Sequence, residues 1–297
     1  MLLQEEDGSW PQPLYTVDGE LPEEFVIDDL RGPNGEMPIR FGNQAARQIQ
    51  LDNIGNIVHG LWYYYEKSGD INYLERHWDN ILLASQWLQK TWMRQEQGIW
   101  EIRERMDHWV HGKTMCSVAL ASAAKTAEKL GYSNFAKQWH NTAETIKQQI
   151  ISRGWSKTRR AYLRHYGDDA PLDSSVLALS LYGLLPPNDR RLKSTVQAIE
   201  TPFEEGGLDI HGGIARYEGA ALPFYLTTLW TARHHLRADN PERARELLLL
   251  CLESATNLGL MAEHFDAVNG EQHGNFPQSF SHEEIVRTIL EMERLYY

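Results

Sequence analysis

Two stretches of the sequence hold residue types suited to acid–base chemistry. The first, Gly98–Lys113, reads GIWEIRERMDHWVHGK and places Glu101 directly after Trp100. The second, Gly259–His282, reads GLMAEHFDAVNGEQHGNFPQSFSH and is rich in glycine, asparagine and proline. Its acidic residues are Glu263, Asp266 and Glu271. Long polar loops of this kind bind ligands more often than they only connect helices, so both stretches are candidate functional segments.

We interpret Glu101 and Glu263 as a pair of carboxyl groups that act on one glycosidic bond. In such a pair, one group protonates the leaving oxygen and the other activates water or attacks. The acid must stay protonated near neutral pH, which an apolar neighbour such as Trp100 favours. The alternative is that either glutamate is a solvated loop carboxylate. With 41 acidic residues in the chain, spacing alone gives one pair about a one-in-ten chance of being catalytic.

Polar residues near the first glutamate are candidates for contact with the substrate. His111 and Lys113 follow Glu101 and are predicted to bind substrate hydroxyls or to begin a helix. The spacing of His108 and His111 matches no strong metal motif, so no metal ligand is predicted.

Further polar residues stand at or before the start of helices that we predict to be buried. Gln50 and Asp52 come early in the first of these helices and are predicted to line the mouth of the site. Arg216, followed by Tyr217, precedes another and could donate to sugar hydroxyls, with a surface salt bridge as an equally frequent alternative. Asp173 is predicted to cap a helix rather than to bind a ligand.

Composition narrows the class of protein. The chain of 297 residues has a net charge of −12 and no basic stripe, so no nucleic-acid partner is expected. Its 10 Trp and 13 Tyr suit stacking against sugar rings, although most such residues fill cores. No Rossmann, P-loop, zinc-ligand or nucleophile-elbow pattern is present, so no cofactor is expected.

The sequence also bears on location and redox chemistry. No window approaches about 18 consecutive apolar residues, so we expect no membrane partner. The N-terminal MLLQEEDGSW does not resemble a signal peptide, and a cytoplasmic location is expected. Cys116 and Cys251 lie in apolar helical patterns and are predicted to be small buried residues rather than a disulfide.

Helices must position these loops. After an irregular segment, 1–44, apolar residues recur at helical spacing in segments that are alternately buried all round and amphipathic. The buried segments are 45–67, 113–130, 173–185, 219–236 and one from 281. The amphipathic segments are 72–92, 134–152, 189–200 and one from 241. The long loops that precede buried segments are 93–110, 154–172, 202–218 and 258–280.

Alternating inner and outer helices predict a double-ringed α/α barrel in a single domain, 1–297. All the long loops would then open on one face, which is the expected ligand site. Helix boundaries are predicted at Gly131 and Pro241, and Ser281 with Glu284 fits a capping box.

Several separated stretches resemble glycoside hydrolase family fifteen, which includes glucoamylases, glucodextranases and bacterial trehalases. The run GIWEIRERMDHWVHGKTMCSVALASAAKTAE resembles the stretch around the family's general acid. GLMAEHFDAVNGEQHGNFPQSFSH resembles the general-base stretch, with its GNFPQ-F-SH motif. FGNQAARQIQLDNIGNIVHGL, LDSSVL, GGIARYEGAALPFYLTTLW and PERARELL follow the family's order, so the resemblance covers nearly the whole chain.

The resemblance implies an all-α, (α/α)6 toroid barrel that hydrolyses a terminal α-glucosidic bond with inversion. Glu101 matches the proton donor, Glu263 matches the base that activates water, and Arg216 matches a sugar-binding arginine. The residues that match positions around the acid are Trp100, His111 and Lys113. Inversion implies that the two carboxyl groups lie about 6.5–9.5 Å apart, with room for a water.

The sequence departs from the family at one motif. Family members have an early inner helix with a W-x-R-D-like motif that grips the non-reducing sugar, and this sequence has none. We therefore expect a barrel that is incomplete at its N-terminus and exposes apolar helix faces to a missing N-terminal segment or a homo-oligomer partner.

The expected ligand is an α-glucoside or oligosaccharide substrate. Two alternatives to a hydrolase stay open. One is a catalytically weak or non-catalytic carbohydrate-binding or regulatory α/α barrel, which the lost motif favours. The other is a generic helical interaction module, which would show a regular repeat and short loops on both faces.

Overall fold

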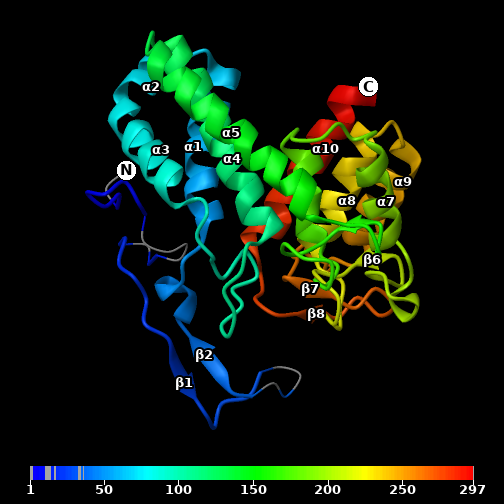
Figure 1. The fold of residues 1–297 in the computed structure, drawn as a ribbon. Coiled ribbons are helices and arrows are strands. Elements are labelled where there is room, and N and C mark those ends of the chain that lie inside the picture. The colour runs from blue at the N-terminus through cyan, green and yellow to red at the C-terminus, as the bar shows by residue number, and fades with distance from the viewer. Residues whose placement is uncertain (1–2, 11–14, 17, 33–34, 36, 297) are drawn as a thin grey trace. The chain divides into compact units, whose positions relative to one another are not determined.

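The computed structural model describes residues 3–10, 15–16, 18–32, 35 and 37–296. The chain divides into two compact units, Met1–Gln148 and Gln149–Tyr297, which we treat in turn. Helices dominate both units, and the strands among the described residues form four separate antiparallel pairs (Figure 1). The predicted mostly helical class is therefore confirmed.

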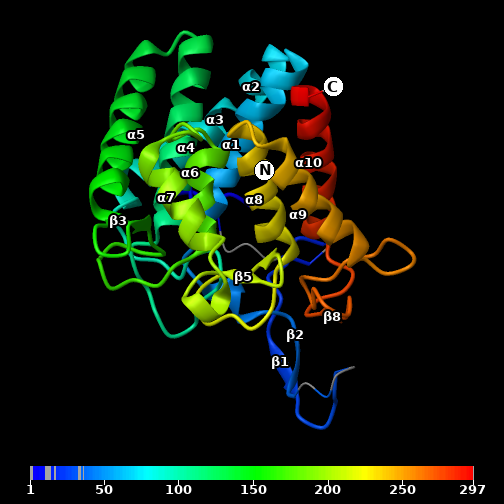
Figure 2. The same cartoon turned by 90° about the vertical axis from the view of Figure 1, so that its right-hand side faces the viewer.

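The first unit is built on helices that follow a short hairpin. Its elements are β1 (Phe25–Ile27), β2 (Ile39–Phe41), the 3-10 helix η1 (Gln44–Arg47), α1 (Leu51–Ser68), α2 (Ile71–Arg76), α3 (Trp78–Thr91), α4 (Val110–Lys129) and α5 (Ser133–Arg153), which runs into the second unit. The hairpin extends away from the helices of this unit, and α4 and α5 run side by side (Figures 1 and 2).

Helix α4 forms the core of the first unit. Its small and apolar side chains are buried on nearly every face, as predicted for a buried segment. Helix α1 packs closely along α4, because Gly55 has no side chain to hold the two apart. A Cβ at Gly55 would lie 2.6 Å from the Cβ of Met115. Trp78, the first residue of α3, stacks on Tyr132 in the turn between α4 and α5, with ring centroids 4.2 Å apart.

The second unit alternates helices with short hairpins. Its elements are β3 (Trp155–Ser156), β4 (Ala161–Tyr162), η2 (Ser174–Leu177), α6 (Ala178–Leu181), α7 (Arg190–Ile199), η3 (Phe203–Glu205), β5 (Asp209–Ile210), β6 (Gly213–Ile214), α8 (Tyr225–Arg237), α9 (Pro241–Glu253), β7 (His264–Phe265), β8 (Gln272–His273) and α10 (Ser279–Tyr296). The pairs are β3–β4, β5–β6 and β7–β8.

Helix α8 is the centre of the second unit and packs against α9 and α10. Tyr225 and Leu229 on α8 join a buried apolar cluster with residues of α9, α10 and the loop before α10. Further along α8, the buried Arg233 bridges Glu284 and Glu291 of α10. A hairpin adjoins the start of α8, where the Tyr225 N–H donates to the Glu263 carbonyl at 3.1 Å.

Several predicted boundaries are confirmed. Asp173 caps η2 by accepting from the Ser175 N–H at 2.7 Å. Pro241 begins α9 after the capping residue Asn240. Gly131 follows the end of α4 with a φ of +85°, the left-handed conformation typical of a helix stop.

Other predicted boundaries are wrong. The segment 72–92 is interrupted at His77, and 173–185 is a short 3-10 and α-helical piece. The segment 219–236 begins as a helix only at Tyr225, because Pro223 and Phe224 are extended and form β-bridges with Ala215 and His264. The part of 1–44 that the structure describes contains the β1–β2 pair, which the irregular assignment missed; 1–2, 11–14, 17, 33–34 and 36 lie outside the described residues.

The predicted capping box at Ser281 is also wrong. Helix α10 begins earlier, at Ser279. Ser281 is inside the helix, and its hydroxyl donates to the Ala262 carbonyl at 2.8 Å. Glu284 pairs with Arg233 instead of turning back to the helix start. Both side chains are used for tertiary contacts.

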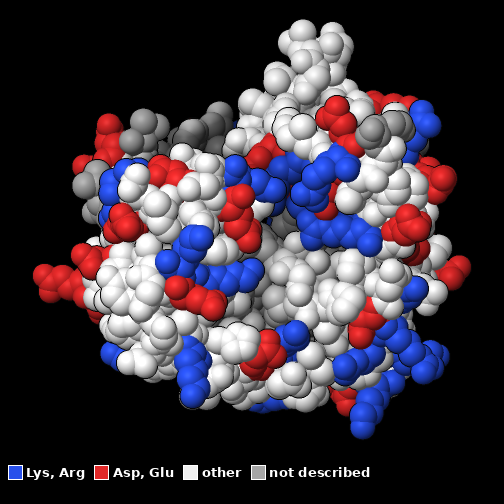
Figure 3. All heavy atoms as spheres, turned by 90° about the horizontal axis from the view of Figure 1, so that it is seen from above, with Lys and Arg blue, Asp and Glu red and all other residues white. Residues whose placement is uncertain are grey.

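Both cysteines, Cys116 and Cys251, are free and fully buried, and burial raises the pKa of each thiol. No helix in the described part of the chain combines the length and apolar composition needed to cross a membrane. The face drawn in Figure 3 carries acidic and basic side chains next to one another in several groups.

Candidate active site

The loop that carries Glu101 is fastened to the segment before α1. Gln97 and Ile49 exchange hydrogen bonds: the Gln97 N–H donates to the Ile49 carbonyl at 3.0 Å, and the Ile49 N–H donates to Gln97 Oε1 at 2.8 Å. Glu96 Oε2 accepts from the Leu51 N–H at 2.7 Å. These tertiary bonds hold residues 48–50 extended, which is why the helix predicted from 45 begins at Leu51.

Glu101 itself is held at both its backbone and its carboxyl group. Its φ is +56°, and its N–H donates to the Gly98 carbonyl at 3.1 Å. Gln48 Nε2 donates to the Glu101 carbonyl at 3.1 Å, and Asn43 Nδ2 donates to Glu101 Oε2 at 2.8 Å. Trp100 next to it is half-buried.

Asp52 and His111 are buried residues near Glu101. Burial raises the pKa of Asp52 to about 6, and the charge of Glu101 contributes in the same direction. Asp52 Oδ1 has no hydrogen-bond partner among the described residues. His111 Nδ1 lies 3.9 Å from Asp52 Oδ2, and burial lowers the pKa of His111 to about 4, so His111 is neutral at pH 7.

Behind them lies a second buried acid that sequence reasoning missed. Glu96 is fully buried, and burial raises its pKa to about 8 against the opposing charge of Lys113. Gly112 leaves the space for it, since a Cβ there would lie 1.8 Å from Glu96 Oε1. Lys113 Nζ donates to the Arg94 carbonyl at 2.5 Å.

In the second unit, the GNFPQ segment surrounds the carboxylate of Glu263. The Asn275 N–H donates to Glu263 Oε2 at 3.2 Å, and Asn275 Nδ2 donates to Oε1 at 3.1 Å. Gln278 Nε2 donates to Oε1 at 3.4 Å. Gly274 has a φ of +80°, and a Cβ there would lie 2.5 Å from Glu263 Oε2. These three donors fix the position of the Glu263 carboxyl group.

The rest of that motif fixes the main chain just before Glu263. The Gln278 N–H donates to the Met261 carbonyl at 2.8 Å, and the Met261 N–H donates to His282 Nε2 at 3.2 Å. The Ser281 hydroxyl donates to the Ala262 carbonyl at 2.8 Å. The motif therefore fixes the main chain at Met261 and Ala262.

Arg216 lies among aromatic rings in the same unit. Its guanidinium carbon is 5.4 Å from the Tyr217 ring centroid and 5.3 Å from that of Phe224. The Phe224 ring in turn lies 4.7 Å from the His264 ring. Burial, together with the charge of Arg216, lowers the pKa of His264 to about 3, so the residue after Glu263 is neutral.

The other two acids of the second stretch belong to a turn. Asp266 Oδ1 accepts from the Val268 and Asn269 N–H groups at 2.8 and 3.3 Å. Glu271 is exposed at the end of the same turn. Asp266 thus shapes the β7–β8 hairpin.

The structure brings the predicted residues together as two groups. Within the first unit, Gln50 lies in the same network as Glu101, because its Nε2 donates to Gln48 Oε1 at 3.1 Å. The second unit holds Arg216 and Glu263 beside the start of α8. Sequence reasoning missed Asn43, although it lies in the stretch FGNQAARQIQLDN; only the contact reveals its role.

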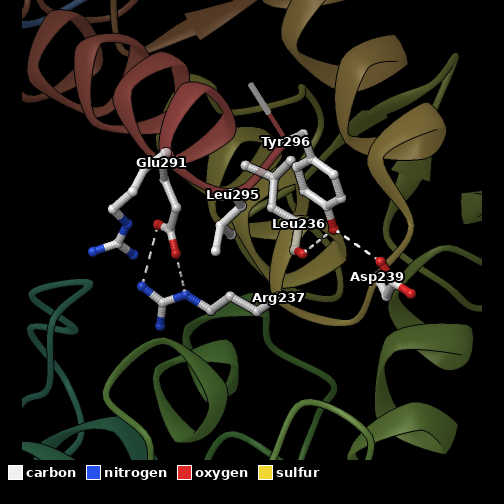
Figure 4. A pocket seen from close by; sticks show the side chains of 7 residues that line it. Leu236, Arg237, Asp239, Glu291, Leu295 and Tyr296 are labelled. Carbon is white, nitrogen blue, oxygen red and sulfur yellow. Dashed lines mark hydrogen bonds and ion pairs between the residues drawn. The ribbon is translucent and has the colours of Figure 1, made fainter.

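No group of three or more His, Cys, Asp or Glu side chains within the described ranges is placed to hold a metal ion. A pocket of about 420 Å³ lies elsewhere, at the far end of α8. There Arg237 pairs with Glu291, and the Tyr296 hydroxyl donates to the Leu236 carbonyl (Figure 4). The length of a 13-residue helix, about 20 Å, separates this pocket from Glu263.

The chain has relatives among characterised proteins. It is 34% identical over 300 residues to trehalase 2 of Sulfolobus acidocaldarius, covering 99% of this chain and 51% of the relative. It is 33% identical over 291 residues to the trehalase of Mycobacterium tuberculosis, covering 95% of this chain and 42% of the relative. The chain thus spans about half the length of the curated relatives it matches.

Solved structures show the same fold. A glycosidase variant in complex with glucose superposes with a TM-score of 0.73 at 18% identity, over 90% of this chain and 75% of that one. A bacterial glucoamylase complexed with acarbose gives 0.65 at 15% identity, over 84% of this chain and 44% of that one. These neighbours are (α/α)6 barrels of glucoamylase type, which confirms the predicted fold class. The family model for glycosyl hydrolases family 15 matches residues 10–245 and 236–290, which include Glu101 and Glu263. The chain therefore belongs to this family.

Proposed function

We propose that this chain is the catalytic portion of an inverting α-glucoside hydrolase, with trehalose as its first candidate substrate. The observation that carries the proposal is the family match over nearly the whole chain, with curated relatives above 30% identity that are named trehalases. Glucoamylase-type substrates such as maltose come second, on the weaker likeness in structure.

In the proposed reaction, Glu101 is the general acid and Glu263 the general base. Glu101 gives its proton to the glycosidic oxygen while the bond from the anomeric carbon to that oxygen breaks and its electron pair stays on the oxygen. Glu263 takes a proton from a water whose oxygen bonds to the anomeric carbon from the opposite side. The three donors that hold the Glu263 carboxyl group in place support its assignment as the base.

Sugar contacts are proposed for the other predicted residues. Asp52 is the strongest of these, since a buried carboxylate oxygen with no partner among the described residues can accept from a sugar hydroxyl. Arg216 offers a cation beside aromatic rings, a surface on which a sugar can stack. Contacts from Gln50, Trp100, His111 and Lys113 stay predictions.

The test measures glucose release from trehalose, maltose and isomaltose by the purified chain. The same measurement is made on the variants Glu101→Gln and Glu263→Gln. We expect release from trehalose, and a loss of about 10²- to 10⁴-fold in each variant, the usual contribution of a general acid or base. Glu128→Gln, an exposed change on α4, serves as the control.

Absence of release from every substrate, with a folded protein by circular dichroism, would contradict the proposal. Calorimetric titration with trehalose and maltose would then test the carbohydrate-binding alternative. Activity that survives Glu101→Gln or Glu263→Gln would instead show that the acid or the base is assigned to the wrong residue.

A further inference from the structure

The carboxyl group of Glu101 is presented by a backbone with little freedom. The φ of +56° is a conformation that residues other than glycine rarely adopt, and it persists only where the surroundings hold it. Gln48 holds the Glu101 carbonyl at 3.1 Å and is itself held by Gln50 at 3.1 Å. With the main chain fixed, the contact at Oε2 decides how the carboxyl group is oriented.

That contact comes from the Asn43 side chain, whose two ends have separate partners. Asn43 Oδ1 accepts from the Ala45 N–H at 2.9 Å, at the start of η1. Because the oxygen faces Ala45, the NH₂ group must face Glu101, and Nδ2 donates to Glu101 Oε2 at 2.8 Å. The orientation of the amide is thus set by the backbone and not by Glu101 itself.

We propose that Asn43 is a positioning residue that selects the oxygen of Glu101 from which the proton is donated. The inference rests on the proposed role of Glu101 as general acid. A neutral carboxyl group has one O–H and one acceptor oxygen. Since the Asn43 Nδ2 can only donate, Oε2 must be the acceptor, and the proton lies on Oε1.

Asn43 also acts during the proton transfer. As Oε1–H gives its proton to the glycosidic oxygen, the O–H electron pair stays on Glu101, and the negative charge spreads to Oε2. Hydrogen bonds to an ionised oxygen are about twice as strong as neutral ones. Asn43 therefore stabilises the transition state more than the bound substrate, and this lowers the barrier rather than the KM.

The experiment compares two substrates in the purified chain. Trehalose needs its leaving oxygen protonated, whereas α-glucosyl fluoride releases a fluoride ion, which leaves with little help from an acid. For Asn43→Ala we expect kcat on trehalose to fall about 10- to 100-fold, the range for a lost hydrogen bond to a charged group. The KM for trehalose and the rate on the fluoride should change less than about threefold, because neither depends on the proton of Glu101.

Asn43→Asp separates this role from the capping of η1. Aspartate is as good a cap as asparagine, but it has no N–H to offer and presents an oxygen to Glu101 Oε2. We expect its rate on trehalose to be as low as that of Asn43→Ala. Gln44→Ala is the matched control, since Gln44 shares the same turn and bonds to Arg103.

Each other outcome overturns the inference. If Asn43→Asp recovers the parent's rate, Asn43 is only a cap. If both variants lose trehalose and fluoride hydrolysis equally, the effect is on folding or on the base. Glu101→Gln tests the proposed function separately: if it still hydrolyses trehalose, or if the parent hydrolyses neither substrate, that assignment fails, and the role of Asn43 fails with it.

Discussion

Gly274 lies so close to Glu263 that a side chain at position 274 would collide with the Glu263 carboxylate. We expect Gly274→Ala to displace the carboxylate, since the new Cβ would lie 2.5 Å from Glu263 Oε2. A displacement near 1 Å can cost about 100-fold in rate, so hydrolysis of trehalose should fall by at least about tenfold. Steady-state kinetics of glucose release measures this loss.

Gly270→Ala is the control for this change. Its φ of +75° imposes the same backbone strain as the +80° of Gly274, but its nearest neighbour is the Ser254 carbonyl oxygen at 3.9 Å. Both variants should lose a similar free energy of unfolding, and only Gly274→Ala should lose activity. Equal rates for the two variants would show that the Glu263 carboxylate tolerates the shift.

The buried Glu96 makes the stability of the protein depend on pH. Its pKa in the folded protein, about 8, lies above the 4.5 of an exposed glutamate. The folded protein thus binds this proton more tightly than the unfolded chain does. The contribution to stability is complete below about pH 4.5 and is lost as the pH rises toward 8.

Glu96→Gln should therefore become more stable relative to the parent as the pH rises from about 5 to about 8, by at most about 1.4 kcal/mol per pH unit. Urea unfolding of both proteins at intervals of pH measures the difference. Glu128→Gln, at an exposed position, should follow the parent throughout. A constant difference between Glu96→Gln and the parent would mean that Glu96 has the same pKa in the folded protein and in the unfolded chain.

At the scale of elements, the contact between α1 and α4 depends on one of two glycines in α1. Gly55→Ala would force its Cβ to within 2.6 Å of the Met115 Cβ, and we expect a loss of about 1–3 kcal/mol of unfolding free energy. At Gly60, on the same helix, a Cβ would meet nothing within 4 Å. Gly60→Ala should stabilise by about 0.5–1 kcal/mol, because alanine loses less backbone entropy.

Urea unfolding of the two variants provides the comparison. The difference in sign is the informative result, since both changes add the same methyl group to the same helix. If both variants are stabilised, α1 can move away from α4 without cost, and the close approach at Gly55 is not a constraint.

Periodicity predicted the helices well in α4, which is buried on nearly every face, and in α5, which buries one face. It failed where tertiary contacts decide the backbone. Residues 48–50 have a helical pattern, yet they are extended, because Ile49 pairs with Gln97. The short pairs β3–β4, β5–β6 and β7–β8 have only two residues a strand, which is too short for an alternating pattern to appear.

At the scale of the whole molecule, the proposed mechanism predicts the configuration of the products. Inversion at one glucose of α,α-trehalose gives β-glucose from that half, while the leaving half is released as α-glucose. We expect equal amounts of the two anomers before mutarotation. NMR spectra recorded early in the reaction measure these amounts. An excess of α-glucose would indicate retention and would assign Glu263 a nucleophilic role.

The candidate site shows what sequence can and cannot supply. Glu101 and Glu263 were predicted because motifs of consecutive residues surround them. The partners of Glu263 lie in its own motif. By contrast, Asn43, which donates to Glu101, lies 58 positions before it. Glu96 was missed because a buried acid is visible only once the surroundings are known.

The buried thiols offer a practical advantage. Cys116 in the first unit and Cys251 in the second are inaccessible, and their raised pKa values keep them in the unreactive thiol form at neutral pH. A cysteine introduced at an exposed position, such as Glu128 or Val268, would react alone with a maleimide dye or spin label. The natural chain is thus ready for site-specific labelling of either unit.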